Sequence, residues 1–304
     1  MLTVAIPTYQ REAVLLQTLA HVMAQVPPPG EILVVDQTAR HEAETERRLA
    51  EWQAAGAIVW LRQAEPSVTQ AMNSALASAS NDIVLFVDDD VLPEAGLIAA
   101  HLEAHRRETN VLVAGRIIQP WQEGVALEDA AAFHFAQTKQ AWIGEFMGGN
   151  FSVDCREALA LGGFDENFVR VAYRFEAEFA WRWRRSGRRI LFEPDACLHH
   201  LKAPAGGTRS FGQHLTSYRP DHAVGAYYFL LRTVAGPAKL AGILSRPIRA
   251  VANRHHLRAP WWIPATLLAE LSGMIWAVRL AARGPRYAGP RPDRLVLERG
   301  CSHD

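Results

Sequence analysis

Residues 1–90 alternate short apolar runs with amphipathic stretches, and this alternation constrains the fold more than any other feature. The apolar runs, at 2–6, 32–35, 58–61 and 83–87, are short and bounded by polar residues, as is typical of strands. Stretches with helical period separate them, at 12–25, 42–55 and 67–79. Strands that exchange regularly with helices form crossover units, so the pattern predicts an α/β fold with a doubly wound, mostly parallel sheet flanked by helices.

Composition narrows the class of protein. The 304 residues are 49% apolar, which is ample for a buried core, and 32 Lys and Arg balance 32 Asp and Glu, so nucleic acid is not expected as a partner. Cys155, Cys197 and Cys301 are far apart without CxxC spacing, which argues against a disulfide framework or a zinc site and favours the cytoplasm. No basic segment precedes the first apolar run, so we expect no secretory signal and a mature chain that begins near Met1.

Three consecutive aspartates, Asp88, Asp89 and Asp90, follow the apolar run at 83–87. The carboxyl ends of parallel strands meet at the edge where open α/β sheets bind ligands. Asp88 and Asp90 project to the same side of an extended backbone and can share one Mg²⁺ or Mn²⁺, whereas Asp89 faces the other way and has a structural role. The alternative is that the triplet caps a helix beginning near Pro93. Three carboxylates repel one another unless a cation offsets them, which favours the metal.

The same edge collects Pro7, Thr8 and Tyr9 after the first strand, Asp36 after the second and Arg62 after the third. The turn at 7–12 contains no glycine, and no GxxxxGK[ST] motif occurs in the chain. Both observations argue against the backbone phosphate cradles of dinucleotide-binding proteins and phosphate-loop NTPases. We therefore predict a crevice in which a metal holds the phosphates of a nucleotide ligand.

A second polar cluster lies at 148–152, 161–165 and 174–182. Glu178 and Arg182 form an i,i+4 pair on a predicted helix, so Glu178 has a structural partner. Glu176 has no basic residue three or four positions further on, which makes it the freer carboxylate and the candidate general base. The alternative is a solvated residue in the first turn of the helix, stabilised by the helix dipole.

Four motifs together resemble family 2 glycosyltransferases of the GT-A fold: VAIPTYQRE at 4–12, LVVDQT at 33–38, NDIVLFVDDDVLP at 81–93 and GGFDENF at 162–168. The resemblance covers about residues 2–210. It implies an inverting transfer of a sugar from a nucleotide-diphosphate sugar to an acceptor hydroxyl, with Mg²⁺ or Mn²⁺ on the diphosphate, in polysaccharide or cell-surface glycan synthesis. We expect residues 1–115 to form the donor-binding half of one catalytic domain and residues 116–215 its acceptor-binding half.

The resemblance also implies roles for donor-side residues. Pro7, Thr8 and Tyr9 would form the pocket for the base and ribose together with Asp36, which would accept a hydrogen bond from the base. Asp88 and Asp90 are similar to the metal-binding Asp-x-Asp of the family.

On the acceptor side, Asn150 looks like part of the wall between the donor sugar and the acceptor, and Glu176 falls at the position of the catalytic base.

A histidine after the strand at 189–198 recurs in GT-A enzymes as a metal or diphosphate contact. His199 and His200 cannot both point the same way in a strand, and we favour His200. We expect Arg209, on a glycine-flanked loop, to act as a clamp for the charge of the diphosphate.

Two departures from the family pattern affect these assignments. Met72-Asn73 stands where members usually show Arg-Asn, so the contact from that arginine to the donor is absent or comes from another residue such as Arg62. Phe175-Glu176 replaces the usual Glu-Asp pair, which leaves one longer carboxylate as the sole base.

Residues 216–304 differ in composition from the rest of the chain. Residues 222–269 contain no Asp or Glu and are rich in basic and aromatic residues, and residues 267–282 repeat apolar side chains at helical spacing around Glu270 and Arg279. We expect a basic helical extension that lies on an anionic membrane surface, which would place the protein peripherally on the inner face of the cytoplasmic membrane. The alternative is a helical cap packed on the catalytic domain. From Gly284 onward we expect an irregular, mobile tail.

Two other classes of function share parts of the pattern. A sugar nucleotidyltransferase normally needs a glycine-rich basic loop early in the chain, which is missing here. A non-catalytic sugar or nucleotide binding protein would keep the crevice and need no base. The expected partners are a nucleotide-sugar donor and a glycan, lipid-linked or other hydroxyl acceptor, whose identity the motifs leave open.

Overall fold

The computed structural model describes residues 1–123 and 135–289. Its first part alternates strands and helices in the expected order and close to the expected positions. These elements are β1 (Thr3–Thr8), α1 (Ala13–Met23), β2 (Glu31–Asp36), α2 (Ala43–Ala54), β3 (Val59–Arg62), α3 (Val68–Ser78) and β4 (Ile83–Val87). The strand order β3-β2-β1-β4 is parallel throughout, so all four carboxyl ends point to one edge of the sheet.

The second half of the sheet is mixed, which corrects the expectation of a mostly parallel sheet. It contains β5 (Val91–Pro93), β6 (Val111–Ile118), β7 (Ala141–Ile143), β8 (Asn150–Asp154) and β9 (Arg189–His200). β8 runs antiparallel between β4 and β6, and β9 is parallel to β6 but antiparallel to β5 and β7. These pairings join segments far apart in the chain, so no local pattern specifies their direction.

Helices cover both faces of this sheet, as a doubly wound arrangement requires. Along β1, Val4 and Ile6 belong to one core cluster with α1, α2 and α4 (Leu97–Arg107), whereas Ala5 belongs to the cluster with α3, α5 (Cys155–Ala160) and α6 (Phe175–Arg185). Successive side chains of a strand point to opposite faces, so this split follows from the strand period of two.

An aromatic core lies under the edge where β4 ends and β8 begins. Phe86 of β4 stacks on Phe151 of β8 with ring centroids 4.9 Å apart, and Phe164 contacts Phe86 edge-on at 6.1 Å. Phe164 also meets Phe175 and Phe179 of α6 at 5.7 and 4.6 Å. These contacts fix the N-terminal turn of α6 against the sheet.

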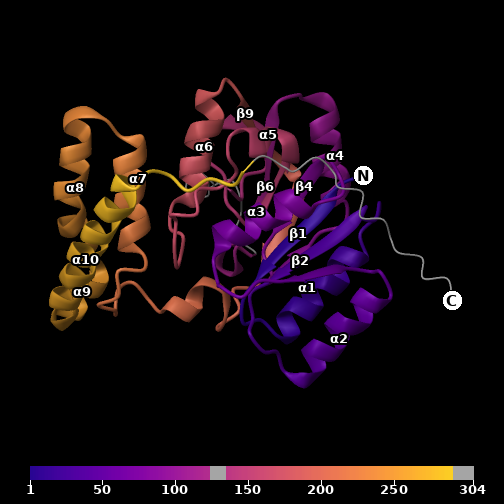
Figure 1. The fold of residues 1–304 in the computed structure, drawn as a ribbon, viewed down its shortest axis with the longest axis horizontal. Helices are drawn as coiled ribbons and strands as arrows, with labels where there is room; N and C mark the ends of the chain where they lie inside the picture. The colour runs from indigo at the N-terminus through magenta and orange to yellow at the C-terminus, as the bar shows by residue number, and fades with distance from the viewer. Residues whose placement is uncertain (124–134, 290–304) are drawn as a thin grey trace.

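The C-terminal helices form a separate layer beside the α/β domain (Figure 1). They are α7 (Ala223–Thr233), α8 (Gly236–Val251), the short α9 (Arg254–Arg258) and α10 (Ile263–Ala282). α7 packs against α6, and α10 packs along α7, where a Cβ added at Gly273 would lie only 2.6 Å from the Cβ of Ala223. The extension therefore packs on the α/β domain through α7, as the cap alternative requires. Among the described residues, Pro260–Ala282 has the length and apolar composition to cross a membrane, a property that core helices share.

Asp165 of the motif at 162–168 holds the extension in place. Its Oδ2 accepts a hydrogen bond of 2.7 Å from the Tyr228 hydroxyl of α7, and its Oδ1 accepts one of 3.0 Å from the backbone N–H of Arg286. The backbone N–H of Ala288 donates to the carbonyl of Gly162 at 2.8 Å. Residues 286–288 are thus irregular but bound to the domain, which corrects the expected mobility there. The rest of the predicted tail, residues 290–304, lies outside the described residues, as does Cys301.

Candidate active site

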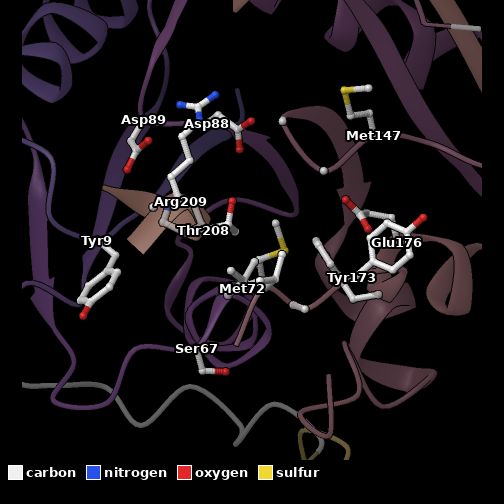
Figure 2. A pocket seen from close by; sticks show the side chains of 18 of the residues that line it. Tyr9, Ser67, Met72, Asp88, Asp89, Met147, Tyr173, Glu176, Thr208 and Arg209 are labelled. Atoms are coloured by element: carbon white, nitrogen blue, oxygen red, sulfur yellow. The ribbon is translucent and has the colours of Figure 1, made fainter. Parts of the chain in front are cut away.

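A cavity of about 450 Å³ opens at the edge where β1 and β4 end. The Gly148-Gly149 loop, the start of α6, the end of β9 and the 3-10 helix η3 (Gly207–Phe211) complete its walls. Pro7, Thr8 and Tyr9 line it, as the sequence predicts. Figure 2 shows Asp88 and Glu176 entering the space from two different sides, with the Met72 side chain between them. Donor and base residues predicted from separate motifs therefore share one cavity.

Asp88, Asp90 and His200 lie together, with one ligand atom from each within 4.8 Å of the others. His200 Nε2 is 3.1 Å from Asp90 Oδ1 and 4.0 Å from Asp88 Oδ2. His199, its neighbour in β9, turns away and bonds Glu94 at 3.0 Å. The strand alternation thus decides which histidine faces the aspartates, and it is the predicted one.

Arg11 offsets the charge of the triplet, and sequence reasoning did not single it out. Its Nε lies 3.0 Å from Asp89 Oδ1 and its Nη2 lies 3.2 Å from Asp90 Oδ2. Thr8 Oγ1 donates to Asp89 at 2.8 Å, so Asp89 has the expected structural partners. Burial works against ionisation of Asp90, yet its bond to His200 and the Arg11 charge leave its pKa below the ordinary value. Three adjacent carboxylates need a cation nearby, and this need could have pointed to Arg11 from the sequence.

The helix-capping alternative for the triplet is wrong. The residues after Asp90 form strand β5, which pairs with β9, and α4 begins only at Leu97 after an N-terminal cap at Gly96. The carboxylates are therefore free of any role at that helix.

Two glycines separate the aspartates from Glu176. A Cβ added at Gly149 would lie 2.3 Å from Asp88 Oδ2, and one at Gly148 would lie 3.0 Å from the Phe175 ring and 3.1 Å from Glu176 Oε1. Only glycine lets the backbone approach both carboxylates so closely. This loop, which joins β7 to β8, sets how far the two acidic groups stand apart.

Glu176 occupies the first turn of α6, held there by Phe175 in the aromatic core. Burial among these groups raises the pKa of its carboxyl to about 7, and the neighbouring Asp88 adds to this effect. Glu178, in contrast, is fully buried and bonded by Arg182, with Nε 2.9 Å from Oε1. The prediction that Glu178 is paired is confirmed, and Glu176 is the carboxyl that faces the cavity.

Arg209 lies on η3, which covers the turn after β1. The backbone N–H of Gly207 donates to the Tyr9 carbonyl at 2.7 Å, and a Cβ added at Gly206 would lie 2.2 Å from the Gln10 carbonyl oxygen. Arg209 Nη1 is 3.6 Å from Asp90 Oδ2 and lines the cavity. Its guanidinium therefore stands beside the aspartates, at the place expected for a diphosphate clamp.

Asp36 does not occupy its predicted place in the donor pocket. Its carboxylate is fully buried, with Oδ1 accepting from the Thr38 N–H at 2.8 Å and Oδ2 bonding Trp60 Nε1 at 2.9 Å and His41 Nε2 at 2.8 Å. The next residue, Gln37, lines the cavity instead. The predicted bond from Asp36 to the base is therefore wrong for this structure, because protein groups already use both oxygens.

Arg62 is also committed elsewhere. It bonds Glu46 at 2.9 Å and the Thr38 carbonyl at 3.1 Å, and it does not line the cavity. Met72 does line the cavity, while Asn73 turns inward and donates to the Phe164 carbonyl at 2.9 Å. Arg62 therefore does not replace the missing family arginine here. The arginines that line the cavity are Arg11, Arg170, Arg174 and Arg209.

Asn150 is likewise buried rather than exposed to the cavity. Its Nδ2 donates to the carbonyls of Arg116 and Ala196 at 3.0 and 2.9 Å, so its Oδ1 accepts from His101 Nε2 at 2.9 Å. This arrangement joins β8 to β6 and β9. Asn150 is thus a structural residue, and Gly148 and Gly149 just before it form the wall it was expected to provide.

Comparison with known proteins agrees with this geometry. Residues 3–146 match the model of the family "Glycosyl transferase family 2". The "Uncharacterized glycosyltransferase YfnE" of Bacillus subtilis (strain 168) is 31% identical over 115 residues, which are 37% of this chain and 29% of that relative. The match thus spans less than a third of the length of this curated relative.

Solved structures share the fold beyond the matched segment. A mannosyltransferase from Pyrobaculum calidifontis, in complex with GDP-Man and Mn²⁺, is 23% identical with a TM-score of 0.54 over 93% of this chain and 79% of its own. S. aureus TarS 1-349 is 16% identical with a TM-score of 0.53, covering 89% of this chain and 90% of its own. GalNAc-T7 with UDP, GalNAc and Mn²⁺ is 12% identical with a TM-score of 0.55, over 66% of this chain and 43% of its own. Residues 3–146 are thus similar to glycosyltransferase family 2, and the fold of the chain resembles that of these glycosyltransferase structures.

Proposed function

We propose that the chain is a metal-dependent, inverting glycosyltransferase that moves a sugar from a nucleoside diphosphate sugar to an acceptor hydroxyl. One observation carries the proposal: the Asp88, Asp90 and His200 cluster and the Glu176 carboxyl line the same cavity of a family 2 domain. A non-catalytic binding protein would have no use for an acid whose pKa is raised to about 7 beside the ligand space.

The cluster fits a divalent cation by its chemistry. Two carboxylates and an imidazole offer oxygen and nitrogen ligands, and the Asp88 side chain keeps about half of its surface, 47%, open to the cavity. Mg²⁺ and Mn²⁺ favour such oxygen-rich sets. The cation would neutralise the diphosphate as negative charge develops on it. Asp88, Asp90 and His200 would hold it.

The remaining chemistry belongs to the residues of the chain. Glu176 accepts the proton of the acceptor hydroxyl while that oxygen forms its bond to the anomeric carbon. The bond from the anomeric carbon to the diphosphate breaks, and the diphosphate leaves with the electron pair. A single displacement of this kind inverts the anomeric centre, and it needs only one base. Arg209 lies beside the aspartates, where its charge would stabilise the leaving diphosphate.

Pro7, Thr8, Tyr9 and Gln37 are the groups we assign to the nucleoside, since they line the cavity at the ends of β1 and β2. Two of the similar structures carry UDP and GDP-Man, which supports a nucleotide-linked donor for this chain. For the acceptor we propose a hydroxyl of a growing polysaccharide or cell-surface glycan.

The test is release of nucleoside diphosphate from a panel of UDP-, GDP- and dTDP-sugars, with Mg²⁺ or Mn²⁺ and with excess EDTA. We expect metal-dependent release with at least one donor, and loss of that release in Asp90→Asn. Asp82→Asn is the matched control, because Asp82 is an exposed aspartate just before the other end of β4. Full activity in EDTA, or nucleotide binding without release from any donor, would contradict the proposal.

A further inference from the structure

Helices α8 and α10 each expose a stripe of large apolar side chains. In α8, Leu240, Leu244 and Ile248 follow one another at intervals of four residues and are 60 to 67% exposed. None of the 16 residues of α8 is buried. In α10 the exposed apolar side chains are Leu267, Leu268, Leu271, Ile275 and Val278. Isolated exposed leucines are ordinary, but aligned stripes on two adjacent helices mark an interaction surface.

Both stripes point away from the rest of the protein. Gly242 of α8 faces Leu230 of α7, because an added Cβ would lie 3.3 Å from that side chain. Gly273 of α10 faces Ala223 of α7 in the same way. Leu244 and Leu271, two positions from these glycines, lie on the opposite sides of their helices. An ion pair of 3.0 Å between Arg246 Nε and Glu270 Oε2 joins the two helices.

The connection between the two helices extends this surface. Leu257 of α9 and Trp261 of the following 3-10 turn are 82 and 70% exposed. We call the two stripes together with Leu257 and Trp261 the outer face.

The exposed charged side chains of residues 222–289, around the outer face, are positive. From residue 222 to residue 289, Glu270 is the only acidic residue, and it is buried against Arg246. Exposed cations are distributed along the same helices and just after them: Arg249, Arg254, Arg258, Arg279 and Arg283. The surface therefore presents apolar side chains and positive charge with no exposed negative charge among the residues of this span.

We propose that the outer face docks on an anionic lipid bilayer, with α8 and α10 lying in the plane of the interface. Apolar side chains would enter the acyl boundary, Trp261 would sit at the headgroup level, and the arginines would meet lipid phosphates. A second copy of the chain fits less well, since a symmetric contact would bring the same cations together with no acids to pair them. α10 does not cross the bilayer, because its other side holds Glu270 and Gly273 against α8 and α7.

The test is flotation of the full-length protein with vesicles of 30 mol% phosphatidylglycerol in phosphatidylcholine, compared with pure phosphatidylcholine. We expect binding to the anionic vesicles, at least tenfold weaker binding to the neutral ones, and release by high salt. The double variant Leu244→Ser, Leu271→Ser should lose at least tenfold in binding, and Arg254→Glu, Arg258→Glu should lose most of its binding at low salt. Val26→Ser, at a 79% exposed apolar residue outside the extension, and Arg106→Glu, at an exposed arginine of α4, are the matched controls.

Nucleoside diphosphate release measured without vesicles reports separately on the catalytic domain and confirms that each variant is folded. No binding of wild-type protein to anionic vesicles at low salt would overturn the proposal, as would equal binding by the leucine double variant. Retention in vesicles after alkaline carbonate extraction would indicate a membrane span instead. Self-association in ultracentrifugation that the leucine variant abolishes, without vesicle binding, would assign the outer face to a second copy.

Discussion

The role of a residue depends on its partners as well as on its side-chain type, as two aspartates show. Asp36 ends β2 and Asp90 follows the end of β4, at the same edge of the sheet. Asp36 is nevertheless buried and bonded by Thr38, Trp60 and His41, whereas Asp90 lies beside His200. Burial opposes ionisation of Asp36, but its bond to His41 leaves its pKa below the ordinary value. The partners, rather than the aspartate itself, decide which of them can meet a ligand.

Glu176→Gln should abolish most of the transfer activity. The amide cannot accept the proton of the acceptor hydroxyl, so we expect kcat to fall by about 10² to 10⁴. The fold should persist, because the side chain volume is conserved. Rates of nucleoside diphosphate release, with urea unfolding as the check on stability, would measure this. A variant that keeps wild-type kcat would remove Glu176 from the mechanism.

The pH dependence of the wild-type enzyme should report the same residue. Burial raises the pKa of Glu176 to about 7, and only the ionised carboxylate can act as a base. Activity should therefore rise as pH increases from about 6 to 8 and then level off. The residual activity of Glu176→Gln should lack this step, so a step that survives in the variant would belong to another group.

At the scale of elements, the loop between β7 and β8 is as important as the residues it separates. Gly149 allows the backbone to touch the Asp88 carboxylate, and Gly148 does the same for Glu176. The spacing of the two acidic groups therefore depends on two residues without side chains.

Gly149→Ala should impair metal-dependent turnover in a folded protein. A Cβ at 2.3 Å from Asp88 Oδ2 must displace either the carboxylate or the loop, so we expect at least a tenfold higher metal concentration for half-maximal activity. Gly144→Ala is the matched control in the same segment, since its new Cβ would meet only the flexible end of Arg184 at 3.2 Å. Equal metal titrations for both variants would refute this view of the loop.

Two histidines of α4, His101 and His105, bond side chains of β8, and their burial predicts that acid destabilises the folded protein. Burial lowers the pKa of His101 to about 3 and that of His105 to about 4, so both stay neutral in the folded state at pH values where the unfolded chain binds protons. The contribution of these two histidines to stability should be constant above about pH 7 and should fall as pH drops from 6.5 towards 4. Urea unfolding at pH 7.5 and 5 would measure it. His105→Gln should reduce the loss, and exposed His21→Gln should not.

For the whole molecule, the motif at 162–168 joins two layers. Asp165 and Asn167 together bond the Tyr228 hydroxyl of α7, with Asn167 Nδ2 2.9 Å from that oxygen. The residues that support the family resemblance here therefore anchor the helical extension and do not line the cavity.

Tyr228→Phe should destabilise the protein without changing the cavity. The variant leaves Asp165 Oδ2 and Asn167 Nδ2 buried with one partner fewer, which costs about 1 to 3 kcal/mol in unfolding free energy. Urea denaturation would detect the change, and Tyr218→Phe, at a 65% exposed tyrosine, should leave stability unaltered. Unchanged stability in Tyr228→Phe would show that the network does not hold the extension.

The resemblance to family 2 glycosyltransferases, rather than local period, pointed to His200 and Glu176. The sequence by itself determined the alternating elements of residues 1–90 and the edge of the sheet that carries Asp88 and Asp90. These features depend on local hydrophobic period and on the rule that parallel strands end at one edge of the sheet, and both can be applied to the sequence alone. The tertiary structure alone decided the antiparallel second half of the sheet, the pairing of Arg11 with the aspartates, and the burial of Asp36 and Asn150. Each of these features depends on contacts between segments that are far apart in the chain, and no local sequence pattern specifies which segments meet. Burial of Asp36 and Asn150 also depends on how many of their hydrogen bonds are made to other protein groups.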